Sequence, residues 1–391
     1  MQHNRGSVAL ILCWIGLLCA TRPTLASTLS SLSHPAPKVL VAATAAAASR
    51  RTPAPAQDGW ERRQGGYYTV RRSPGGEVVT HTSLELGPGD IYIDAENNRY
   101  QVTRVDPAAF VVWVRLEGRE ILPKIDEASL AAAAGSIGPQ GRTIPAPVNR
   151  VPFRWRGRAP LVGIYFTHSD ESYEPTSGTA SKLPRGDIFK VGEVLAEGLR
   201  RQGLRVDVRE DIHAPHDGLA YLRSRSTIRR LLPEMPAVLV DVHRDAVPAD
   251  EYRTTIQGRP ASKVRIVVGR QNPQFAANFD FAKRMKAVAD RLYPGLVLGI
   301  FAGHGNYNQD VSPRATLLEF GTYSLPLDQA ATAADLFSRV IPVAAGLTPG
   351  IAAPATYGGW QGIGWTLAIL VVVALGIVFF LDLNRRLPRP N

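Results

Sequence analysis

Short apolar runs that end in polar side chains recur through the middle of the chain. The run at residues 161–166 ends in His168 and Glu171, a second leads into His243, and a third contains Glu319. Apolar runs of this length are typical of buried strands, and the carboxyl ends of parallel strands share the sheet edge where ligands bind. The pattern therefore predicts that these side chains meet in one site.

Helical periodicity separates the strands. Asp187 is the expected N-cap of a helix that ends before Gly203. Further helices are predicted at residues 221–232, 275–292 and 328–341, and further strands at 204–208, 264–268 and 297–301. Strands that alternate with helices of this length predict an α/β fold with a largely parallel sheet covered on both faces. This domain is expected to run from residue 153 to 346.

The segment before it has a different period. Residues 68–71, 89–94 and 100–105 alternate apolar and polar positions, and residues 111–116 form a further expected strand. Residues 64–125 are therefore predicted to form a small β module. A structural addition is the favoured interpretation, and docking to peptidoglycan or a partner is the alternative. The loop-like stretch 126–152 is expected to be a linker.

The beginning of the chain has the pattern of an export signal. Arg5 precedes an apolar run at residues 8–20, and small residues follow. This order is typical of a secretory signal, so residues 1–26 are expected to be a signal peptide or an uncleaved anchor. Residues 27–63 are rich in Ala, Pro and Ser and are expected to form a flexible tether.

The end of the chain has the pattern of a membrane anchor. After a linker at residues 347–362, residues 363–381 carry no charge and are long enough to span a bilayer. Residues 382–391 follow as a basic tail. By the positive-inside rule this tail lies in the cytoplasm and the folded domains lie outside the cell membrane.

Charge and cysteine content narrow the chemistry. The net charge is +11, which suits nucleic acid, anionic lipid or an anionic wall polymer. No nucleic-acid-binding signature accompanies it, so nucleic acid is discounted as a partner. Both cysteines, Cys13 and Cys19, lie in the first apolar run. A metal in the folded part would therefore be held by His and carboxylate groups.

His168 and His243 are the first candidate metal ligands. A lone histidine at a strand end is usually structural, but two at equivalent places in one sheet, each followed by acids, favour a site. Imidazoles with carboxylates suit Zn²⁺, and a catalytic zinc site needs three protein ligands. The third ligand is open between Glu171 and Asp187, either of which could instead be a capping or solvated carboxylate.

Glu319 is the expected general acid and base of a zinc hydrolase. It lies in an otherwise apolar strand, where a carboxylate is costly unless it is paired or near a metal. A salt bridge to Arg244 or Arg314 is the alternative. Arg244 is a candidate for oxyanion stabilisation, and Asp245 and Asp241 are candidates for orienting the His243 imidazole.

Several segments together resemble the stage II sporulation protein P family. They are residues 167–173, 216–217, 241–245, 268–273, 293–296, 307–310 and 317–321, and the strands at 89–94 and 100–105 resemble the β module of that family. The resemblance runs in order from about residue 67 to residue 346. Ser169 stands where the family usually has Thr, a change that keeps the hydroxyl.

The resemblance implies a zinc-dependent N-acetylmuramoyl-L-alanine amidase that degrades septal peptidoglycan during engulfment, with a reported endopeptidase activity. It also implies a partner similar to stage II sporulation protein D, a lytic transglycosylase. By position, His168 and His243 would hold zinc and Glu319 would be the catalytic acid. The span at residues 363–381 is not a feature of this family and indicates a second attachment to the membrane.

Two other interpretations remain. The first is a non-catalytic peptidoglycan-binding scaffold that uses a cleft at the same strand ends. It predicts wall binding that survives removal of metal. The second is metal-independent cleavage of a peptide bond, which would leave a different amino terminus on the product. The three strand-end groups favour the zinc hydrolase over the scaffold.

Overall fold

The computed structural model describes residues 66–134 and 158–347. All of the described residues belong to one compact unit. The predicted signal, tether, membrane span and basic tail lie outside the described residues, as does the linker after Leu347. Within the described ranges, no helix has both the length and the apolar character needed to cross a bilayer.

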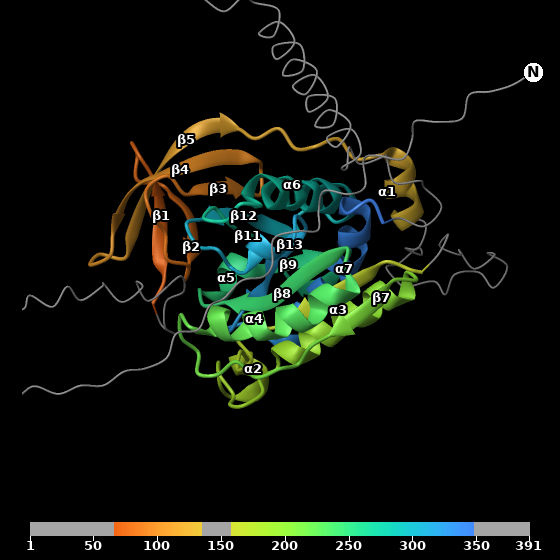
Figure 1. Ribbon diagram of the computed structural model, residues 1–391. Coiled ribbons are helices and arrows are strands. Elements are labelled where there is room, and N and C mark those ends of the chain that lie inside the picture. Colours follow the sequence, from red (N-terminus) through yellow and green to blue (C-terminus); the bar gives the residue numbers. More distant parts are fainter. Residues whose placement is uncertain (1–65, 135–157, 348–391) are drawn as a thin grey trace, which may run out of the picture. The chain divides into compact units, whose positions relative to one another are not determined.

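The strands fall into two sheets (Figure 1). The N-terminal module contributes β1 (Tyr68–Arg72), β2 (Val78–Thr82), β3 (Ile91–Asp94), β4 (Asn98–Asp106) and β5 (Val111–Arg119). The C-terminal section, residues 158–347, contributes β6 (Leu161–Tyr165), β7 (Arg205–Val208), β8 (Val238–Asp245), β11 (Val264–Gly269), β12 (Val297–Gly303) and β13 (Ala315–Thr322). These strands form one 11-stranded sheet in the order β2-β1-β5-β4-β3-β12-β11-β13-β8-β6-β7. A separate hairpin pairs β9 (Arg253–Ile256) with β10 (Arg259–Ser262).

Most strand pairs within the C-terminal section are parallel, as predicted. β7, β6, β8 and β13 run in the same direction, whereas β11 is antiparallel to β13 and β12 is parallel to β11. The reversal follows from the connection between β8 and β11. That connection contains the β9–β10 hairpin instead of a long crossover helix, so the chain re-enters the sheet from the edge at which β8 ended.

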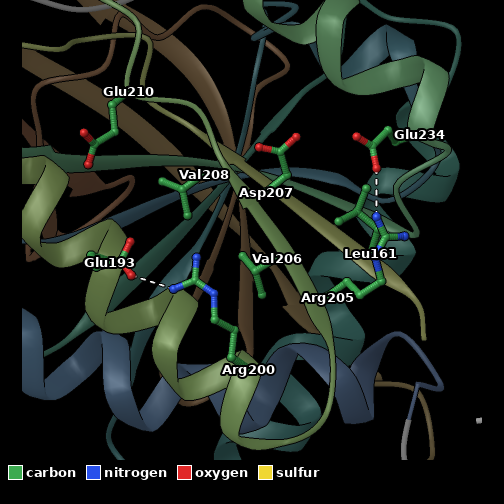
Figure 2. Close-up of a pocket in the computed structure, with 9 residues that line it drawn as sticks. All are labelled: Leu161, Glu193, Arg200, Arg205, Val206, Asp207, Val208, Glu210 and Glu234. Atoms are coloured by element: carbon green, nitrogen blue, oxygen red, sulfur yellow. Dashed lines mark hydrogen bonds and ion pairs between the residues drawn. The ribbon is translucent and has the colours of Figure 1, made fainter. Parts of the chain in front are cut away.

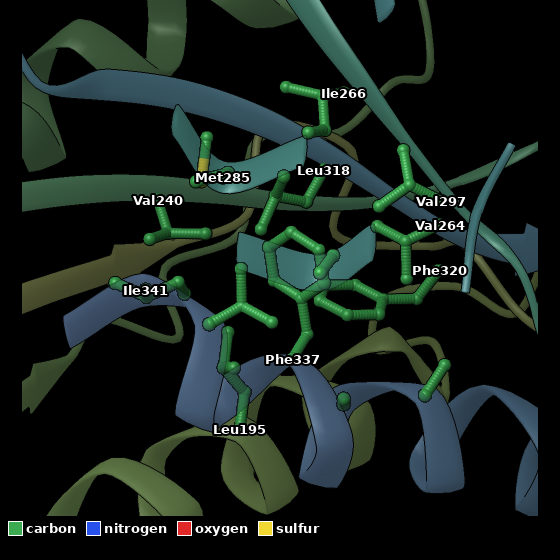
Figure 3. Packing of buried hydrophobic residues seen from close by; sticks show 14 of the residues in the cluster. Leu195, Val240, Val264, Ile266, Met285, Val297, Leu318, Phe320, Phe337 and Ile341 are labelled. Carbon is green, nitrogen blue, oxygen red and sulfur yellow. The ribbon is translucent and has the colours of Figure 1, made fainter. Parts of the chain in front are cut away.

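Helices cover the sheet, and their bounds lie close to the predicted ones. The longer helices are α3 (Ile188–Arg201), α4 (Ala220–Leu231), α6 (Phe275–Leu292) and α7 (Leu327–Ala344). The short ones are α2 (Glu174–Ser177), α5 (Ala249–Tyr252) and the 3₁₀ turns Leu232–Glu234 and Gln309–Val311. One large core joins α3, α6 and α7 to one face of the sheet. Figure 3 shows Phe337 and Ile341 of α7 packed against Val240 and Leu318 of the sheet in this core.

The opposite face of the sheet is covered by α4 and by the N-terminal module. Ile228 and Leu231 of α4 pack on Tyr165 and Leu239. The module is not a separate sheet, because β3 pairs with β12 in an antiparallel ladder. A second core joins module residues to the C-terminal section through Val267, Phe301 and Leu317, together with Tyr221 and Tyr307. The module is therefore part of the structure that surrounds the strand ends.

The stretch expected to be a linker begins with a helix. Residues Glu127–Ala134 form α1, in which Leu130 and Ala133 are buried in the main core. The alanine-rich sequence has high helix propensity, and its two apolar contacts fix it on the surface of the C-terminal section. The rest of that stretch, up to residue 157, lies outside the described residues.

Candidate metal centre

Three neighbouring parallel strands bring the predicted site residues to one edge of the sheet. β8 lies between β6 and β13 and is parallel to both. Glu319 of β13 is the direct register partner of His243 of β8, so the two side chains leave the same face. His168 follows three residues after the end of β6. The prediction that these strand ends share one edge is confirmed.

His168, Glu171 and His243 form a compact buried triad. Each offers one ligand atom, and these atoms all lie within 4.8 Å of one another. Oε1 of Glu171 is 3.7 Å from Nδ1 of each histidine. Two imidazoles and one carboxylate are a donor set that zinc accepts in catalytic sites. The geometry thus permits a metal ion at this point.

Asp187, the alternative third ligand, points elsewhere. It directly precedes α3, where Oδ1 accepts a hydrogen bond from Nζ of Lys190 at 2.7 Å. Its backbone N–H donates to Oγ of Ser172 at 3.1 Å. Of the two carboxylates that the sequence left open, the structure therefore places Glu171 with the histidines.

The loop that carries Glu171 depends on one glycine. Gly186 donates a backbone hydrogen bond to the carbonyl of Ser169 at 2.8 Å. A Cβ atom at Gly186 would lie 2.0 Å from the carbonyl oxygen of Glu171 and 2.5 Å from the carbonyl carbon of Asp170. Any larger residue would displace the Glu171 backbone, so the close approach of these two loop segments requires glycine.

Asp241 orients the His243 ring, as strand alternation predicted. Its Oδ1 lies 3.1 Å from Nε2 of His243 and accepts the backbone N–H of Thr167 at 2.9 Å. Burial alone would lower the pKa of His243, but the negative charges of Asp241 and Glu171 outweigh it and raise that pKa well above its usual value. The surroundings therefore favour a positive charge, whether it is carried by a proton or by a metal ion.

Glu171 is ionised in the same surroundings. Burial opposes the charge, but the charges of His243 and Arg244 and the hydrogen bonds of the two histidines hold the pKa of Glu171 well below its usual value. A buried, ionised carboxylate flanked by two imidazoles is prepared to bind a cation.

Arg244 supports Glu171 and does not point toward His243. The two neighbours leave opposite faces of β8. The backbone N–H of Arg244 donates to Oε2 of Glu171 at 3.0 Å, and its guanidinium donates to the carbonyls of Ser172 at 3.3 Å and Ala180 at 2.9 Å. These contacts pin the loop on which Glu171 lies, which is a positioning role.

We therefore expect Arg244→Met to lower zinc affinity by about 10- to 100-fold, the usual effect of losing a partner that orients a metal ligand. Competition with a chelator of known affinity measures it. Arg200→Met, in an exposed ion pair with Glu193, is the matched control and should not change zinc affinity. Unchanged zinc affinity with lower kcat in Arg244→Met would instead support oxyanion stabilisation.

The family model for stage II sporulation protein P matches residues 118–342 of the 391. The chain belongs to the stage II sporulation protein P family. It is 31% identical over 212 residues to stage II sporulation protein P of Bacillus subtilis (strain 168), and the match covers 48% of this chain and 53% of that protein. The chain thus spans about half the length of this relative.

Solved structures of amidases also show similarity to part of this chain. The N-acetylmuramyl-L-alanine amidase Ami1 from Mycobacterium smegmatis is 14% identical, with a TM-score of 0.33 over 48% of this chain and 98% of that one. The CwlD amidase from Clostridioides difficile, solved in complex with the GerS lipoprotein, is 13% identical, with a TM-score of 0.33 over 47% and 95%.

His216 lies against the triad, a placement that the pattern of strands did not reveal. Its ring stacks on His168 with centroids 3.8 Å apart, and Nδ1 lies 3.1 Å from Oδ1 of Asp170. Tyr221 adds a third aromatic side chain, edge-on to His168 at 5.5 Å and parallel to His243 at 6.2 Å. The available signal was the family resemblance at residues 216–217. Asp217 is not the N-cap of α4, because Leu219 holds that position without a side-chain cap; Oδ1 of Asp217 accepts the N–H of Leu219 at 3.0 Å.

Asp245 connects the site strand to the N-terminal module instead of orienting His243. Its carboxylate accepts hydrogen bonds from Oγ of Ser83 at 2.7 Å and Oη of Tyr252 at 2.8 Å, and it pairs with Arg265. Arg265 in turn donates to Oγ1 of Thr80 at 2.8 Å. A buried polar network therefore ties β2 of the module to β8 and β11.

A groove of about 570 Å³ lies along β7, the edge strand of the sheet (Figure 2). Its lining contains none of the triad residues. Its charged side chains pair with one another, as Glu193 does with Arg200 and Arg205 with Glu234 at 2.8 Å. Charged residues commonly protect an edge strand from pairing with other chains. We therefore interpret the charged pairs that line this groove as protection of the edge strand β7 against pairing with other chains.

Proposed function

We propose that this chain is a zinc-dependent N-acetylmuramoyl-L-alanine amidase that cleaves septal peptidoglycan during sporulation. One observation carries the proposal: a buried His168–Glu171–His243 triad lies beside Glu319, which shares its register with His243. Membership of the stage II sporulation protein P family supports the substrate class. The choice of the bond between the lactyl group and L-alanine rests on the family resemblance.

The residues fit a zinc ion. The three donor atoms lie within 4.8 Å of one another, and they belong to two imidazoles and one ionised carboxylate. Oδ1 of Asp241 lies 3.1 Å from Nε2, the second ring nitrogen of His243. Carboxylate–histidine pairs of this kind are a regular feature of zinc sites. Bound to His168, Glu171 and His243, zinc would supply Lewis-acid polarisation of the scissile carbonyl.

The remaining chemistry belongs to Glu319. Its side chain is on the His243 side of the sheet, and the residue is 3% exposed. In the proposed reaction its carboxylate takes a proton from the attacking water and passes it to the nitrogen of the leaving L-alanine. Asp241 holds the His243 ring in one orientation during these transfers, and Arg244 holds the loop of Glu171.

Product analysis by mass spectrometry tests the proposal. Purified chain should release stem peptides with a free L-alanine amino terminus from peptidoglycan, lose this activity with a chelator and regain it with Zn²⁺. Cleavage that survives chelation would overturn zinc dependence. Wall binding without any product, with or without metal, would support the scaffold instead. A new amino terminus within the stem peptide would reveal endopeptidase activity.

We also propose that the enzyme works outside the cell membrane and is held there at one or both ends of the chain. The apolar runs at residues 8–20 and 363–381 and the basic tail support this placement. A partner similar to stage II sporulation protein D, which would cut the glycan strands, belongs to the same proposal. Fractionation of sporulating cells, with protease added from outside, tests the orientation.

A further inference from the structure

His216 differs from the triad in its access to solvent. Its side chain is 25% exposed, whereas those of His168 and Glu171 are each 1% exposed and that of His243 is fully buried. The ring nevertheless stacks on His168 with an angle of 24° between the planes. His216 is therefore a solvent-accessible imidazole in direct contact with the triad, and it is not one of the proposed metal ligands.

Hydrogen bonds to two other parts of the fold hold the loop that carries His216. Nε of Arg223 donates to the carbonyl of His213 at 2.6 Å, and its Nη2 donates to the carbonyl of Pro215 at 2.5 Å. His213 is buried, and its Nδ1 lies 2.7 Å from the carbonyl of Phe166, two residues before His168. The loop is thus fastened both to α4 and to the strand end that supplies the triad. Fixed placement of this kind is typical of a functional side chain.

Asp170 sets which nitrogen of His216 carries a proton. Its Oδ1 faces Nδ1 of His216, and its Oδ2 accepts the hydroxyl of Ser181. An ionised carboxylate only accepts hydrogen bonds, so Nδ1 is the donor in this pair. In the neutral ring Nε2 is then an acceptor. A carboxylate that orients an imidazole for work at its other nitrogen is a recurrent catalytic arrangement.

We propose that His216, oriented by Asp170, is a catalytic residue that contacts the substrate, with Nε2 accepting a hydrogen bond from the N–H of the amide that is cleaved. The proposal rests on the amidase function stated above. It adds a fifth working side chain, from the loop before α4, to His168, Glu171, His243 and Glu319, and a hydrogen bond of this type aligns the amide for attack.

A purely structural role makes a different prediction. If His216 only supports His168 by stacking, any flat ring at this position should be sufficient. His216→Phe keeps a ring against His168 but removes both nitrogens. Asp170→Asn keeps the His216 ring and changes the partner that fixes its proton. The two variants therefore separate stacking from hydrogen bonding.

We expect His216→Phe to lower kcat/KM for a purified muropeptide by about 100-fold, the scale of one lost catalytic hydrogen-bonding group. Zinc affinity, measured by chelator competition, should stay unchanged. A second readout needs no turnover: calorimetry should show that Glu319→Gln/His216→Phe binds the muropeptide about tenfold more weakly than Glu319→Gln alone. Asp170→Asn should also lower kcat/KM, because the carboxylate that orients His216 is lost.

His304→Phe is the matched control. His304 is also a partly exposed histidine paired with an aspartate, Asp90, at 2.9 Å, but it follows β12 at the opposite edge of the sheet. The His304→Phe variant should cleave the muropeptide at the wild-type rate. Wild-type rates and binding in His216→Phe would overturn the inference and leave the amidase standing. Parallel loss of zinc affinity and activity would also overturn it, in favour of support for His168. Absence of cleavage by the wild-type chain would overturn the amidase, and this inference with it.

Discussion

Glu319→Gln is expected to lower kcat for amide hydrolysis by about 10²- to 10⁴-fold, because glutamine cannot carry a proton from water to the leaving nitrogen. The change is nearly isosteric at a buried position, so the fold should persist. Rates on purified muropeptides, with zinc content and thermal unfolding measured on the same samples, report the effect.

The matched control is Glu193→Gln, which changes an exposed glutamate of α3 that pairs with Arg200. It should keep wild-type activity. Activity retained in Glu319→Gln would remove Glu319 from the mechanism. Loss of zinc together with activity would instead assign the residue to metal binding.

Arg265→Met is expected to cost about 3–5 kcal/mol of unfolding free energy, because it leaves a buried charge without its partner. Arg265 is fully buried, pairs with Asp245 and donates to the carbonyl of His81 at 2.9 Å. Its guanidinium also lies 4.9 Å from the ring centre of Phe301. Urea denaturation with an unchanged m-value measures the loss.

Two comparisons interpret that loss. Arg265→Met/Asp245→Asn should regain part of the stability, because no uncompensated buried charge remains. Arg200→Met breaks an exposed pair and should cost no more than about 1 kcal/mol. A loss of that small size in Arg265→Met would show that the buried network contributes little to stability.

The core of the site could be predicted because it depends on local rules. Strand periodicity placed His243 and Glu319 near strand ends, and alternation placed Asp241 on the face of His243. Helix bounds followed from apolar spacing and were accurate at residues 275–292. These features are encoded within a few residues of one another, so a single sequence is sufficient to read them.

The remainder depends on contacts between distant segments. His216 lies in a loop without periodicity, and only the fold brings it against His168. The pairing of β3 with β12 joins residues about two hundred positions apart, and no local pattern indicates it. Arg244 is a similar case. Strand alternation predicts that its side chain points away from His243, but it does not predict that the guanidinium contacts the loop that carries Glu171.

The β3–β12 ladder has a practical consequence for anyone who cuts the chain. A fragment that starts after β5 would leave the edge of β12, from Gly299 to Ala302, without its neighbour. Unpaired backbone donors and acceptors on an apolar strand can pair with the same strand of another copy. Such a fragment is therefore expected to aggregate. The sensible cloning boundary therefore lies upstream of β1, and chimeras between relatives should exchange both parts together.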